Sequence, residues 1–94
     1  MVHILHSSTV GSVGSLRIVV PNRPASHNRA YVYCSLRGKR GTSNESFVIF
    51  LDDLSIENYS ASSKSVKDGV KYVKKNLSKC KAEWNRTHPN FPVI

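Results

Sequence analysis

The chain has 94 residues, with 14 Lys or Arg against 6 Asp or Glu, which gives a net charge of +8 at pH 7. A chain of this length fits one small domain and leaves little room for a deep enzyme cleft beside a core. No apolar run approaches the roughly 20 residues that span a bilayer, and the N-terminus lacks the layout of a secretory signal. We therefore expect one small basic domain over residues 1–94, cytoplasmic and without a membrane partner.

The N-terminal part of the chain predicts two strands separated by a loop. Val2 to Leu5 is a short apolar stretch that suits a strand, and the Ser- and Gly-rich segment 7–14 is typical of a loop. Leu16 to Val20 is rich in β-branched residues and predicts a strand that ends at Pro21. The segment 22–28, with its Asn, Pro and Ser residues, has the composition of an exposed turn.

A strand with two unlike faces is predicted over residues 29–37, because their character alternates with period two. A flexible, positive connection over residues 38–44 then leads into a buried strand over residues 45–51, and the two strands form a hairpin. The face of strand 29–37 that points away from the core is basic and aromatic. Its residues are Arg29, Tyr31, Tyr33, Ser35 and Arg37, and the apolar face carries Val32, Cys34 and Leu36.

An amphipathic helix is predicted in the C-terminal third, with Ser65 as its N-cap and Asp68 as the acid of a short capping box. Apolar residues follow at spacings of four, three, four, three and four, which is the helical period. Lysines flank this stripe on one side. The stripe consists of Val66, Val70, Val73, Leu77, Cys80 and Trp84, and the flank of Lys67, Lys71, Lys74, Lys75 and Lys81.

These elements predict an α+β fold, in which a small antiparallel sheet of three to four strands packs on one C-terminal amphipathic helix. Residues 85–94 contain Pro89 and Pro92, so we expect an extended tail that lies along the domain or contacts a second chain. Both a monomer and a homodimer are compatible with a short sheet that has free edges.

No catalytic or metal site can be assembled from the sequence, and we expect neither an enzyme nor a cofactor. The histidines are scattered, and on a strand His3 and His6 would point to opposite faces. Asp52, Asp53 and Glu57 have no partner that would complete an acid–base pair, and they read as a solvated loop after a strand. Cys34 and Cys80 fall on apolar sides of their elements and are expected as free buried thiols.

The positive charge and the tyrosine-bearing strand predict a nucleic-acid-binding module, with single strands favoured, because tyrosines stack on unpaired bases while cations neutralise phosphates. The alternative is a small interaction or inhibitor protein, for example from a phage or mobile element, that docks on an acidic surface of a larger host protein. The candidate binding residues are Arg17, Arg29, Tyr31, Tyr33, Arg37, Lys39, Arg40, Lys67, Lys71, Lys74 and Lys75.

Overall fold

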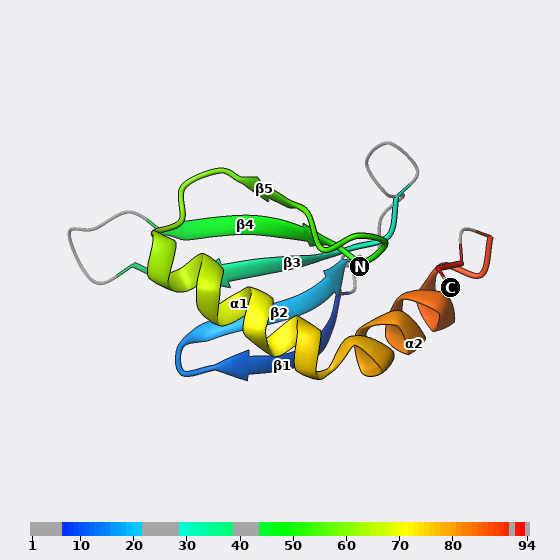
Figure 1. Ribbon diagram of the computed structural model, residues 1–94. Helices are drawn as coiled ribbons and strands as arrows, with labels where there is room; N and C mark the ends of the chain where they lie inside the picture. Colours follow the sequence, from blue (N-terminus) through cyan, green and yellow to red (C-terminus); the bar gives the residue numbers. More distant parts are fainter. Residues whose placement is uncertain (1–6, 22–28, 39–43, 91, 94) are drawn as a thin grey trace, which may run out of the picture.

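The computed structural model describes residues 7–21, 29–38, 44–90 and 92–93 as an antiparallel five-stranded sheet followed by two helices (Figure 1). Each strand pairs with its neighbour in the chain, so the sheet order is β1-β2-β3-β4-β5. The α+β class is confirmed, whereas the sheet has more strands than predicted and the helix is divided. The elements are β1 (Ser7–Val13), β2 (Leu16–Pro21), β3 (Tyr31–Leu36), β4 (Glu45–Phe50), β5 (Ile56–Asn58), α1 (Ser63–Lys75) and α2 (Leu77–Thr87).

The Ser- and Gly-rich segment expected to be a loop is strand β1, so that prediction was wrong. β1 pairs with β2 through a bulge between Thr9 and Gly11. A Cβ at Gly11 would lie 1.9 Å from the hydroxyl oxygen of Tyr72, which donates to the carbonyl of Val10 at 3.3 Å. Gly11 therefore marks the close approach of a helix side chain to an edge strand, and composition alone cannot distinguish that from a turn. The strand expected over Val2 to Leu5 lies outside the described residues.

The predicted hairpin of residues 29–37 and 45–51 is present as β3 and β4, which pair from Tyr31 with Phe50 to Leu36 with Glu45. The segment after β4, expected to be a loop, includes the short strand β5. Leu54 has a φ of 62° in the connection between them, where its backbone nitrogen donates to the carbonyl of Phe50. A three-residue edge strand is too short to give a clear alternating pattern in the sequence.

The helix begins earlier than predicted, because Ser62 rather than Ser65 is the N-cap. The Ser62 hydroxyl accepts from the backbone nitrogen of Ser65. Glu45 of β4 accepts from the backbone nitrogen of Ser62 and the hydroxyl of Ser65, each at 2.8 Å. These bonds, led by the one from the Ser62 backbone, lower the pKa of Glu45. The contact joins the start of α1 to β4 between residues that are 17 and 20 positions apart in the sequence. A pattern of neighbouring residues cannot reveal a contact over that separation.

The predicted single helix is broken at Asn76, whose backbone lies outside the helical region. Its side-chain amide donates to the carbonyl of Tyr72 at 3.0 Å, a local bond that competes with the regular helix. The apolar spacing survives the break, since Cys80 and Trp84 of α2 are buried with Val73 of α1. Among the described residues, neither helix is long and apolar enough to cross a membrane.

The C-terminal segment also differs from the prediction, because α2 continues to Thr87 and no extended tail begins at Asn85. The Asn85 side chain exchanges two hydrogen bonds with the backbone of Val93, at 2.7 and 2.9 Å. His88, beyond the helix, stacks on Trp84 with ring centroids 3.7 Å apart. His88 and Val93 thus both contact α2.

Both helices lie on one face of the sheet, with α1 running across it (Figure 1). The backbone of α1 lies close to the sheet at Gly69, where an added Cβ would lie 2.6 Å from the Phe47 ring. Cys34 and Cys80 lie in this core as free, buried thiols, as predicted. Burial raises the pKa of Cys34 to about 12 and also raises that of Cys80, so both stay protonated.

Replacing Gly69 with Ala tests this packing, because helix propensity and contact geometry oppose each other. Propensity alone favours Ala by about 1 kcal/mol. The fully buried Phe47 ring leaves the new methyl group no room, so we expect a net loss of about 1–3 kcal/mol in the free energy of unfolding. Urea denaturation followed by Trp84 fluorescence measures it. Lys71→Ala, on the exposed side of α1, is the control and should change stability by less than about 0.5 kcal/mol; equal stability of Gly69→Ala and wild type would contradict the packing argument.

Candidate functional site

The face of the sheet opposite the helices carries side chains in three rows that cross the strands. The register places Arg17, Ser35 and Ser46 side by side on β2, β3 and β4. The next row holds Val19, Tyr33, Val48 and Glu57, and the third holds Tyr31 and Phe50. Successive rows lie about 7 Å apart, because side chains on one face are two residues apart along a strand. The face changes from basic and polar to aromatic along the strand direction.

The aromatic end of this face is a hollow of about 440 Å³. Val48 and Phe50 are each only 5% exposed although they lie on the helix-free face, and the Phe50 ring is contacted by Arg29 and Tyr31. Tyr59, which follows β5, is 59% exposed. The described residues that line it are Pro21, Tyr31, Tyr33, Val48, Phe50, Glu57 and Tyr59. Three tyrosines therefore stand around an apolar floor, and one carboxylate lies among them.

Glu57 is the one acidic residue among the described residues that line this hollow. The Tyr59 hydroxyl donates to its Oε2 at 2.9 Å. Desolvation, and then this hydrogen bond, raise the pKa of Tyr59, which keeps the phenol a donor. A carboxylate has about four acceptor sites, so this one bond leaves both oxygens of Glu57 able to accept further hydrogen bonds.

A second hollow, of about 520 Å³, adjoins the first on the same face. Arg17 and Arg37 both line it, and both are exposed. Tyr33 lines both hollows and therefore stands at the boundary between the aromatic and the basic surface. Arg17 donates to the Thr9 hydroxyl at 3.4 Å, and no acidic side chain in the described ranges forms an ion pair with either arginine.

The alternating pattern predicts Tyr31 on the open face, but its ring also contacts core side chains. Its ring lies 5.5 Å from that of Trp84 in α2 and 6.3 Å from that of Phe50. Tyr31 is the first residue of β3, where the sheet ends and α2 reaches its edge. Its ring therefore joins the core to the wall of the hollow, so Tyr33 and Tyr59 are the better candidates for a stacking surface.

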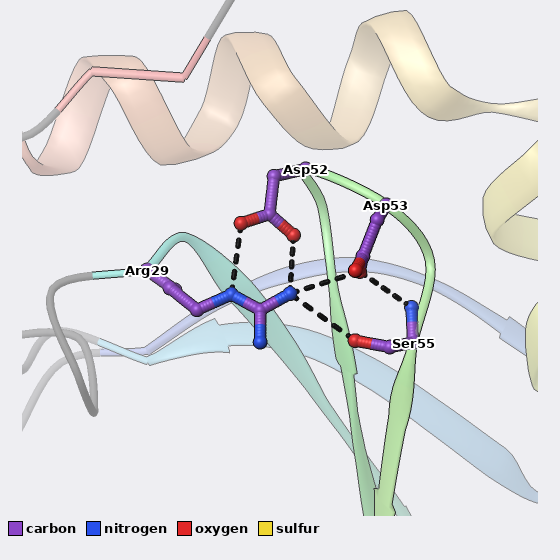
Figure 2. Close-up of polar contacts among 4 residues, drawn as sticks. All are labelled: Arg29, Asp52, Asp53 and Ser55. Atoms are coloured by element: carbon purple, nitrogen blue, oxygen red, sulfur yellow. Dashed lines mark hydrogen bonds and ion pairs between the residues drawn. The ribbon is translucent and has the colours of Figure 1, made fainter.

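Arg29 is engaged within the protein rather than displayed (Figure 2). Its guanidinium donates to both carboxylate oxygens of Asp52, and also to Asp53 and Ser55. The same group lies 4.0 Å from the centre of the Phe50 ring, which is a cation–π contact. Asp52 and Asp53 are exposed at the end of β4, as expected, but they neutralise this arginine. The pairing spans 23 residues and is not visible in the local sequence.

The four candidate lysines of α1 lie on the opposite side of the molecule from the open sheet face. All four are exposed, and no ion pair within the described part of the chain neutralises them. Lys64 pairs with Asp68, the one acidic residue of α1. We call the following residues the lysine ridge: Lys64, Lys67, Lys71, Lys74 and Lys75. The structure thus divides the predicted binding residues between two surfaces, and Lys39 and Arg40 lie outside the described residues.

The sequence reasoning missed Val48, Phe50, Glu57 and Tyr59 as members of this face. The strand over residues 45–51 is buried from Phe47 to Leu51, as predicted. Its unbroken apolar run gives no alternation that would assign Val48 and Phe50 to the open face, and residues 56–59 show no alternating pattern that would reveal Tyr59. No group of three or more His, Cys, Asp or Glu side chains in the described ranges could hold a metal ion.

Comparison with known proteins gave no match to a family model, a curated sequence or a solved structure.

The Arg29 cluster predicts a loss of stability in acid. Its hydrogen bond to Asp52 lowers the pKa of that carboxyl from 3.8 to about 2. A carboxyl group whose pKa is lower in the folded state than in the unfolded state stabilises the fold at pH values above its unfolded-state pKa. This contribution disappears as the pH falls toward the folded-state pKa, here about 2. We expect Asp52→Asn to be less stable than wild type at pH 7, with the difference closing between about pH 4 and pH 2.

Chemical denaturation at a series of pH values measures this difference. Asp68→Asn is the control, because Asp68 pairs only with Lys64, whose side chain is 87% exposed, and such pairs add little. A difference between wild type and Asp52→Asn that persists unchanged at pH 2 would contradict the assignment.

Proposed function

We propose that this protein binds nucleic acid, and single strands in preference to duplex, through the helix-free face of its sheet. One observation carries the proposal: the first hollow, lined by tyrosines and called the tyrosine hollow below, adjoins the second, lined by Arg17 and Arg37 and called the arginine hollow, and Tyr33 lines both. Unpaired bases stack on aromatic side chains while phosphates bind cations, and the two requirements are met by neighbouring surfaces.

The preference for single strands follows from the tyrosines. In a duplex the base faces are stacked on one another and cannot reach a protein ring, whereas a single strand offers them directly. Tyr59 is 59% exposed, and Tyr33 is partly exposed beside it in the same hollow. Each base stacked on such a ring contributes about 1–3 kcal/mol.

The charge distribution supports an anionic ligand on this face. Arg17 and Arg37 are exposed, whereas Arg29 is occupied by Asp52 and Asp53. Two phosphate contacts predict that log K falls with log salt with a slope of roughly −1.4, at about 0.7 for each phosphate on a single strand.

A second candidate function is docking on an acidic protein surface, and the lysine ridge favours it. Five exposed lysines follow one side of α1 over about 16 Å, with only Asp68 to balance them. Such a ridge also attracts any polyanion without selectivity. The two candidates use opposite sides of the molecule, so paired variants separate them.

The first test is a fluorescence-anisotropy titration of labelled single-stranded and double-stranded oligonucleotides at two salt concentrations. We expect tighter binding to the single strand than to the duplex, and tighter binding than by a lysine-rich protein of similar charge. Binding equal to that control protein would refute the proposal, and a pull-down for an acidic protein partner would then test the lysine ridge.

Two double variants each remove positive charge from one surface only, either the open sheet face or the lysine ridge. Arg17→Ala with Arg37→Ala and Lys71→Ala with Lys74→Ala each reduce the net charge by two. We expect the arginine pair to weaken single-strand binding and flatten the salt slope by roughly 1.4, whereas the lysine pair leaves both nearly unchanged. Equal losses from the two variants would show that net charge alone drives binding.

Tyr33 tests the stacking directly. We expect Tyr33→Ala to weaken single-strand binding by roughly 5- to 150-fold, which corresponds to the loss of one base stack. Tyr33→Phe keeps the ring and should bind nearly as well as wild type. Circular dichroism establishes that both variants fold, and a Tyr33→Ala variant with wild-type affinity would remove the tyrosine hollow from the binding site.

A further inference from the structure

Glu57 is out of place on a surface that binds phosphates. It lies on β5 in the same cross-strand row as Tyr33 and Val48, and it lines the tyrosine hollow. A carboxylate here repels the phosphate backbone. Nucleic acid that occupies this face must therefore turn its phosphates toward Arg17 and Arg37 and its bases toward Glu57.

The carboxylate also limits which base fits. An ionised carboxylate only accepts hydrogen bonds, so it favours a base edge that presents donors. Guanine carries a ring N–H and an exocyclic amino group side by side, a pair of parallel donors that matches the two oxygens of a carboxylate. Thymine and uracil present a single donor between two carbonyl oxygens, which a carboxylate repels.

We propose that the tyrosine hollow binds a guanine base of a single strand, with Glu57 accepting from its two donors. This inference rests on the proposed function, since it assigns a base to the same face. The Tyr59 hydroxyl holds Oε2 of Glu57 at 2.9 Å and so orients the carboxylate beside the ring of Tyr59. A planar base that stacks on Tyr33 or Tyr59 meets the carboxylate at its edge.

A positively charged ammonium group is the competing ligand, because aromatic rings with a carboxylate also bind such groups. The rest of the face argues for the base. Arg17 and Arg37 line the adjoining hollow together with Glu45, whose carboxylate already accepts hydrogen bonds from Ser62 and Ser65. The protein carries a net charge of +8, so the surroundings repel a cation and attract an anionic strand.

The test compares short thymidine oligonucleotides that carry one central guanine, adenine, cytosine or no substitution, again by fluorescence anisotropy. We expect the guanine strand to bind at least roughly tenfold more tightly than the thymidine strand, as for a good bidentate contact to a base. Strands with hypoxanthine, which lacks the amino group, or 2-aminopurine, which lacks the ring N–H, should each lose most of that preference.

Glu57→Gln and Asp68→Asn form a matched pair, because each removes one negative charge and Asp68 lies on α1. We expect Glu57→Gln to abolish the guanine preference while still binding the thymidine strand, and Asp68→Asn to retain it. Equal binding of all four strands by the wild type would overturn the inference yet leave the proposed function standing. Displacement of the guanine strand by tetramethylammonium at low concentration, with Glu57→Gln insensitive to it, would overturn it in favour of an ammonium site. Failure to bind any strand more tightly than the lysine-rich control protein would overturn both proposals.

Discussion

The contact between α1 and β4 decides which face of the sheet is left open. Gly69 brings the helix backbone down onto the Phe47 ring, and Glu45 holds the start of the helix through Ser62 and Ser65. These two contacts join the same helix and the same strand at different points, so α1 cannot slide or roll without breaking one of them. Because strand side chains alternate, fixing α1 on one face assigns Tyr33, Val48 and Glu57 to the other.

The open face is more enclosed than simple alternation implies. A strand with one solvated face normally buries every second residue, yet both Val48 and Phe50 are buried on the side without helices. Tyrosines that line the hollow provide part of that cover, and Arg29 lies over Phe50. The aromatic residues thus act as a partial third layer, which explains how a short chain buries so much of β4 without another helix.

Residues with a strong local pattern were predictable, and those that depend on distant partners were not. The alternation of β3 and the stripe ending in Cys80 and Trp84 are properties of neighbouring residues, and both are confirmed in the burial pattern. β1 was missed because Gly11 serves a contact with Tyr72, sixty-one residues further along the chain. At the helix break, the Asn76 side chain shares the Tyr72 carbonyl with its own backbone nitrogen, a bond that any helical Asn can form and that the sequence therefore does not flag.

In the candidate site, too, some residues follow from a local sequence pattern and others depend on distant partners. The sequence identified Tyr33, Arg17 and Arg37, whose exposure on the open face follows from strand alternation and position. It did not identify Tyr59 or Glu57, because β5 is only three residues long and pairs with β4 at a sheet edge. Arg29 counted as available for phosphate until the structure brought Asp52 and Asp53 to it, and a sum of charges contains no information about such pairing.

Positive charge lies on two surfaces, the lysine ridge and the open sheet face, and their compositions suit the two candidate functions unequally. Lysines are depleted at the centres of protein interfaces, where aromatic residues and arginines are enriched. By that measure the lysine ridge is a weak anchor for a protein partner, whereas the open sheet face, with Tyr33, Tyr59, Arg17 and Arg37, has the composition of a stronger one. An acidic partner on that face would nevertheless bring carboxylates toward Glu57, which repels them. A nucleotide carries its charge on the phosphate and none on its flat base. It can therefore place its phosphate on the arginines and its base beside the tyrosines and Glu57, an order that favours a nucleic acid over an acidic protein.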